Sequence, residues 1–184
     1  HTANNIHNNV TNWGLIGSRP TVPSSFSHAP SARWPGGYGT DYLWAAGFWV
    51  GGIVLGERLV STGQFESEII ATTAPEDIIY ATAHGAPGGT RYPWPGADDD
   101  ADGREDEDPL DGRDNDGDGL VDEDFAAAGD REFRCAMWDT TALAQENHPD
   151  HTPLGVAVVQ RSFQWTAAAA VDFIGYEYAV TNVG

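Results

Sequence analysis

The sequence predicts an all-β fold, an antiparallel β-sandwich of jelly-roll or Ig-like type with a long acidic loop inserted between strands. Short runs with period-two alternation and β-branched or aromatic enrichment recur along the 184 residues. Clusters of Gly, Pro, Asn and Asp separate those runs. A hydrophobic content of 40% is enough for one sizeable core, so residues 1–184 are expected to form a single domain.

The first half of the chain predicts one strand and one hairpin. The strand covers about Ile6 to Ile16, and a loop rich in Ser, Pro and Gly follows it to about Gly39. Residues Tyr42 to Thr62 predict two core strands joined by a tight turn at Gly56 and Glu57. The pair Gly51 and Gly52 indicates a bulge or a close backbone approach within this hairpin.

One short helix and three further strands are expected in the rest of the chain. Thr73 and Glu76 have the spacing of a capping box, which predicts a helix over Ala74 to Tyr80. Alternation predicts a strand over Glu132 to Trp138 and a long pair over Leu154 to Trp165 and Phe173 to Val183. This last strand follows an alanine-rich connection and has one face turned toward the core.

The charge of the chain is concentrated in one segment. The 28 acidic and 9 basic residues give a formal charge of −19, which excludes nucleic acid as a partner and disfavours anionic membrane surfaces. Residues 98–124 hold 15 of the acids and only two of the arginines. Without compensating ions, repulsion within that segment would be strong, so a divalent cation is expected there.

The composition excludes several covalent cross-links and a membrane-spanning helix. The chain has no lysine, so neither lysine isopeptide cross-links nor Schiff-base chemistry can occur within it. Its one cysteine, Cys135, cannot form an internal disulfide. No stretch approaches the roughly 20 apolar residues that a membrane helix needs. The start at His1, without an initiator methionine, suggests a processed and exported chain.

Aspartates alternate in the acidic segment in the way that calcium requires. Calcium takes six to eight oxygen ligands, and alternating aspartates followed by a glycine supply them at low steric cost. The pattern occurs twice in residues 98–124. The expected ligands are Asp98, Asp100, Asp102 and Asp106 in the first copy, and Asp114, Asp116, Asp118, Asp122 and the backbone carbonyl of Leu120 in the second, with Asp111 shared between motifs.

Neither copy is an ordinary EF-hand, because the place of the bidentate glutamate holds Pro109 in the first and Phe125 in the second. The stretch DGRDNDGDGLVDED, Asp111 to Asp124, resembles the thrombospondin type 3 calcium repeats. This resemblance implies calcium ions shared by aspartates of neighbouring motifs. The segment lacks the cysteines of that family, so the resemblance does not extend to its disulfide-tied solenoid.

Other candidate sites are weaker. His148, Asp150 and His151 could bind zinc, but Pro149 indicates a loop and no third nitrogen or sulfur ligand is near in sequence. Carboxylate pairs for glycoside hydrolysis could be drawn from several acids, but the sequence does not set their separation. Exposed rings could stack on a sugar or a partner; the candidates are Trp34, Tyr92 and Trp94.

These features favour a structural protein over an enzyme. The runs HTANNI, DYLWAAGFWVGG and YEYAVTNVG resemble uncharacterised β-modules of large bacterial secreted and cell-surface proteins, which implies an extracellular location. We therefore expect a non-enzymatic calcium-binding subunit that assembles with other copies into a fibre, tube or surface layer through a terminal strand. The alternative is a non-catalytic carbohydrate-binding or accessory module of a larger secreted protein.

Overall fold

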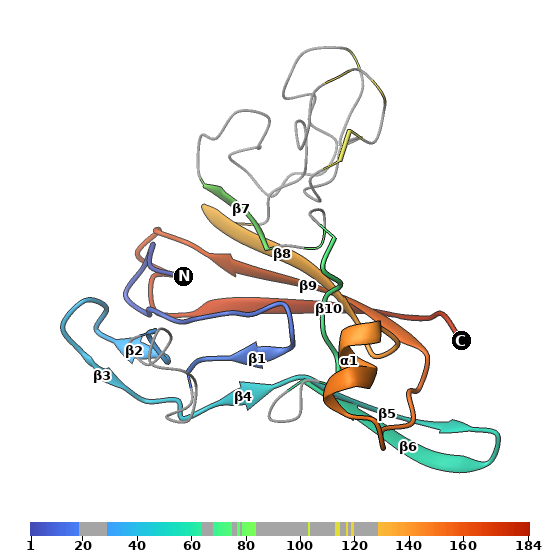
Figure 1. Ribbon diagram of the computed structural model, residues 1–184. Coiled ribbons are helices and arrows are strands. Elements are labelled where there is room, and N and C mark those ends of the chain that lie inside the picture. Colours follow the sequence, from blue (N-terminus) through green and yellow to red (C-terminus); the bar gives the residue numbers. More distant parts are fainter. Residues whose placement is uncertain are drawn as a thin grey trace.

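The computed structural model describes residues 1–18, 29–63, 68–74, 77, 79–83, 103, 113–114, 117, 119 and 129–184. Its strands form one four-stranded sheet and three two-stranded sheets, accompanied by one short helix (Figure 1). The prediction of an all-β fold is confirmed by this content of strands. The closed two-sheet sandwich remains a prediction.

The four-stranded sheet is the largest element of the fold. It consists of β7 (Tyr80–Ala83), β8 (Arg131–Trp138), β9 (Val156–Gln164) and β10 (Ile174–Asn182). All neighbours are antiparallel and the order is β10-β9-β8-β7. The three strands predicted in the last third of the chain are therefore present, close to their expected bounds.

The small sheets come from the N-terminal half. They pair β1 (Leu15–Ile16) with β4 (Ala46–Gly47), β2 (Arg33–Trp34) with β3 (Thr40–Asp41), and β5 (Trp49–Val54) with β6 (Glu57–Thr62). The single strand predicted over residues 6–16 is wrong in extent. Backbone groups there instead bond to scattered partners, such as Pro30 and His1, so only isolated bridges precede β1.

The β5–β6 hairpin is present, but its turn lies one residue earlier than predicted. Leu55 and Gly56 occupy the two turn positions, with φ of 52° and 90°. Positive φ at both positions is the requirement of the type I′ turn that suits a two-residue hairpin. No bulge occurs at Gly51 and Gly52, because the register runs unbroken. Gly52 does show a close approach: a Cβ there would lie 3.0 Å from Leu154 Cδ2.

The helix lies elsewhere than the sequence predicted. Tyr80 begins strand β7, while residues 75, 76 and 78 of the predicted helix lie outside the described residues. The helix of the structure is α1 (Ala142–Asn147), which follows β8. Thr141 caps it, since its hydroxyl accepts a 3.1 Å hydrogen bond from the Ala144 amide. No apolar periodicity marks so short a helix, and the cap is its sequence signal.

The hydrophobic core lies on one face of the four-stranded sheet. Ile69, Cys135, Met137 and Val158 are its fully buried members. Partly buried side chains pack against them, and these include Phe48, between β4 and β5, whose ring stacks on Tyr178 of β10 at 4.7 Å between centroids. Burial of these apolar side chains is the main favourable contribution to folding.

The same face of β9 becomes polar toward its end. Gln160, Ser162 and Gln164 are buried, and the N-terminal residues cover the last two. The His1 ring lies 2.7 Å from Ser162 Oγ, and the Ala3 amide donates to Gln164 Oε1 at 2.9 Å. Buried polar side chains keep their hydrogen bonds in this way. The N-terminal residues are therefore held by polar contacts as well as by the His1 ring, whose centroid lies 4.5 Å from that of Phe133.

Burial of Cys135 makes its thiol a reporter of unfolding. Desolvation raises the pKa of the Cys135 thiol from 9.0 to about 12. The folded state therefore favours the protonated thiol; this contribution to stability is complete below pH 9 and is lost as the pH rises toward 12. Because the thiolate is the nucleophile, we expect alkylation by iodoacetamide at pH 8 to be negligible in the folded protein and rapid in denaturant. Rapid labelling of the folded protein would contradict the buried position.

Candidate functional site

The predicted calcium segment is represented by a few residues of its second copy. Asp114 is the one predicted ligand that the structure describes. The other predicted ligands lie outside the described residues: Asp98, Asp100, Asp102, Asp106, Asp111, Asp116, Asp118, Leu120 and Asp122. The exposed rings proposed at Tyr92 and Trp94 lie outside them as well.

The Asp114 carboxylate begins a tight turn. Its Oδ1 accepts a hydrogen bond from the Gly117 amide at 2.6 Å, and its Oδ2 accepts one from the Gly119 amide at 3.0 Å. Both glycines have positive φ, 88° and 100°, a region that favours glycine because it has no Cβ. The turn thus depends on an aspartate followed by glycines, the residue types that calcium loops use. Among the described residues, no three His, Cys, Asp or Glu side chains gather as a metal-binding group.

Strand β10 forms one edge of the four-stranded sheet. Within the part of the chain that the structure describes, it pairs only with β9, through nine residues in unbroken register. Its one charged residue is Glu177, which lies 3.6 Å from the Arg161 guanidinium. Side chains in its second half, including Val180, are exposed. An edge of this kind presents backbone donors and acceptors that another strand can use.

The β5–β6 hairpin carries a second exposed apolar surface. In Figure 1 it projects beyond the four-stranded sheet, on the side where the C-terminus lies. Ile53, Leu55 and Val60 are exposed, and Leu55 at the tip is completely so, at 101% of its reference area. The prediction that this hairpin belongs to the core is therefore wrong for its outer part, which is exposed.

A buried polar group joins the base of this hairpin to the four-stranded sheet. Asp139 is fully buried and accepts three hydrogen bonds: from the Leu154 amide at 2.6 Å, the Val156 amide at 2.8 Å and the Ser61 hydroxyl at 2.8 Å. The His151 Nε2 lies 3.2 Å from Ser61 Oγ. We call Ser61, Glu68, Asp139 and His151 the Asp139 group.

The Asp139 group has the residue types of a hydrolytic triad but not the arrangement. His151 Nδ1 lies 3.4 Å from Glu68 Oε1, and the Thr62 amide holds Glu68 Oε2 at 2.9 Å. A nucleophilic serine, however, gives its proton to the histidine and is open to substrate. Ser61 donates its proton to Asp139 and is fully buried. The group therefore acts as a link between β6, the residues before β9 and the end of β8.

The Asp139 group has no recognisable signal in the sequence. Ser61 and His151 are 90 positions apart, and nothing in a sequence without an alignment joins them. The sequence predicts a loop at the segment HPDH, and the loop is present: His148 to His151 follow α1. These residues line an open depression of about 650 Å³. In the structure His151 contacts Glu68 and Ser61 instead of completing a described zinc site.

Comparison of the chain with protein-family models, with curated proteins and with solved structures found no match. No helix among the described residues has the length and apolarity to cross a membrane, since α1 contains six residues. Function therefore has to be argued from the surfaces and side chains described above.

Proposed function

We propose that this protein is a non-enzymatic, extracellular structural subunit that assembles with other copies into a fibre, tube or surface layer. In this proposal β10 completes the sheet of a neighbouring copy, and calcium binds in residues 98–124. The two-layer sandwich expected from the sequence would supply the rigid body of the subunit. The observation that carries the proposal is the character of β10 as a sheet edge.

Three features support β10 as an assembly strand. Natural proteins block sheet edges with lysine, proline, bulges or inward charges. β10 contains no lysine and no proline, and its unbroken register with β9 excludes a bulge. Its single charge, Glu177, is near Arg161. Nine residues are also long enough to offer several backbone hydrogen bonds to an added strand.

The proposal of calcium rests on the acidic segment and on Asp114. The segment combines 15 acids with glycines at matching places in two copies, a pattern that a solvated linker does not need. The Asp114 turn, with its two glycine amides, supports this interpretation of the second copy. Calcium would reduce the repulsion among the carboxylates and hold the segment in one conformation.

The proposal is tested by measuring the mass of the purified chain by light scattering, with negative-stain images, in millimolar calcium and in excess chelator. Large regular assemblies in calcium support it. If the assemblies shorten in chelator, calcium contributes to the contact or to the fold that the contact needs. A monodisperse monomer under both conditions would contradict the proposal.

Two lysines added to the β10 edge should prevent assembly without unfolding the protein. We expect Val180→Lys with Thr181→Lys to abolish assembly, because lysines on an edge strand oppose addition of another strand. Both side chains are exposed, so the free energy of unfolding should change by less than about 0.5 kcal/mol per site. Sedimentation of the assembled fraction and a urea melt measure the two effects.

The matched control is Ala142→Lys with Thr152→Lys, which adds the same charge at exposed positions away from β10. This control should assemble as the parent does. Because every added lysine reduces the magnitude of the negative net charge of −19, a general loss of repulsion would favour assembly in both variants. Normal assembly of the β10 variant would exclude β10 as the contact.

A further inference from the structure

An exposed tryptophan lies where β2 meets the connection between β9 and β10. Trp34 keeps 46% of its surface exposed, yet its indole Nε1–H donates a 3.1 Å hydrogen bond to Asp172 Oδ1. The Asn5 side-chain amide donates to the same oxygen at 2.9 Å. These two hydrogen bonds lower the pKa of Asp172, so the carboxylate stays ionised and keeps accepting them.

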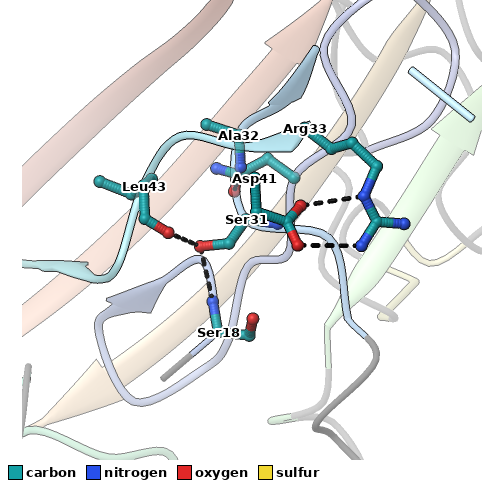
Figure 2. A network of polar contacts seen from close by, with 7 residues as sticks. Ser18, Ser31, Ala32, Arg33, Asp41 and Leu43 are labelled. Carbon is teal, nitrogen blue, oxygen red and sulfur yellow. Dashed lines mark hydrogen bonds and ion pairs between the residues drawn. The ribbon is translucent and has the colours of Figure 1, made fainter. Parts of the chain in front are cut away.

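The hairpin that carries Trp34 is fixed by polar contacts. Figure 2 shows the Arg33 guanidinium facing the Asp41 carboxylate, with hydrogen bonds of 2.9 and 3.0 Å. Asp41 also accepts from the Ser31 amide at 3.1 Å, and the Ser31 hydroxyl donates to the Leu43 carbonyl. Since the hairpin is already ordered, binding a ligand on Trp34 loses little conformational entropy.

The N-terminal residues tie this hairpin to the β9–β10 connection. Arg33 and His7 exchange two backbone hydrogen bonds, of 2.8 and 3.0 Å. The Asn5 carbonyl accepts from the Gly36 amide, and the Asn5 amide donates to the Val171 carbonyl at 2.9 Å. Trp34 and Asp172 are therefore held together by backbone as well as by side chains, although 138 positions separate them.

Two further exposed aromatic residues are close in sequence to Trp34 or to Asp172. Phe173 follows Asp172, is half exposed and has its ring 5.0 Å from that of Trp165. Tyr38, in the loop between β2 and β3, is 99% exposed. The exposed aliphatic side chains lie elsewhere, on the β5–β6 hairpin and near the end of β10: Ile53, Leu55, Val60, Val180 and Val183. We call Trp34, Asp172 and Asn5 the Trp34 surface.

We propose that the Trp34 surface binds a neutral glycan, with a sugar ring stacked on Trp34 and its hydroxyls directed toward Asp172 and Asn5. A pyranose ring has an apolar C–H face and a polar rim, which match an exposed aromatic face beside a carboxylate and an amide. Aromatic rings with one apolar face and a polar neighbour suit such ligands better than aliphatic protein surfaces do. The net charge of −19 and the carboxylates of Asp172 and Asp41 disfavour anionic glycans.

The test measures binding of the whole chain to insoluble cellulose, chitin and β-1,3-glucan, with pectate and heparin as anionic probes. We expect at least one neutral polysaccharide to bind. Trp34→Ala should weaken that binding by about tenfold or more, because it removes the stacking surface. The matched control is Trp49→Ala, which removes another exposed tryptophan (61%, against 46% for Trp34) from β5 and should bind as the parent does.

A second variant keeps the test informative if Trp34→Ala folds poorly. Asp172→Ala leaves the ring in place but removes the acceptor of its indole N–H, and we expect it to weaken binding several-fold with an unchanged circular dichroism spectrum. The proposal is overturned if none of the neutral polysaccharides binds, if only pectate or heparin binds, or if folded Trp34→Ala binds as the parent does. Since a monomer suffices for this binding, the result does not depend on the proposed assembly.

Discussion

Replacing Asp139 by alanine is expected to be the most destabilising of the substitutions proposed, at about 3 kcal/mol or more. Asp139 is fully buried and accepts hydrogen bonds from two backbone amides, of Leu154 and Val156, and from the Ser61 hydroxyl. Alanine leaves these three donors without their acceptor, and each orphaned buried donor costs about 1 to 3 kcal/mol. The loss is a large part of the 5 to 15 kcal/mol that typically stabilises a domain.

The effect should be measured as the shift in the urea midpoint. With a urea slope of about 1 to 3 kcal/mol per molar, a loss of this size moves the midpoint by about 1 M or more. Asp150→Ala removes an exposed carboxylate and should change the free energy of unfolding by less than about 0.5 kcal/mol. Asp139→Asn keeps one acceptor oxygen and should fall between the two. Equal midpoints for Asp139→Ala and the parent would show that the observed hydrogen bonds do not support the fold.

Removing calcium is expected to lower the melting temperature and to change how the chain assembles. This prediction rests on the proposed calcium segment. A ligand that binds only the folded state at a hundredfold excess over its Kd contributes about 2.7 kcal/mol to stability. Excess EGTA should remove that contribution, and added calcium should restore it. Differential scanning calorimetry in calcium and in EGTA measures the change, and isothermal titration calorimetry measures the binding itself.

Asp114→Ala tests the second copy of the motif. It removes both oxygens that accept from the Gly117 and Gly119 amides, together with the carboxylate offered to the ion. We expect calcium affinity at this copy to fall by about tenfold or more. Asp150→Asn removes one exposed charge elsewhere and should leave the affinity unchanged. Identical melting in calcium and EGTA, with no heat of binding, would exclude calcium as a ligand of this chain.

Local sequence patterns are enough to predict the all-β character and the three long strands of the last third of the chain. Alternation marks β8, β9 and β10 because each has one face in or near the core and one face outside it. The β5–β6 hairpin was also predictable, since its flanking residues favour strands and Gly56 favours a turn. These are local properties, set by residues a few positions apart.

Tertiary structure decided the features that join distant positions. Asp139 and Ser61 are 78 residues apart, and Trp34 and Asp172 are 138 apart, so no local pattern shows that they meet. The same holds for the edge position of β10 and for the exposure of the β5–β6 hairpin. Residues 6–16 were expected to form one strand, but their backbone hydrogen bonds go to separate partners, such as His1, Pro30 and Arg33. Local propensity sets which strands can form, whereas long-range hydrogen bonding and burial decide which of them pair and which remain at an edge.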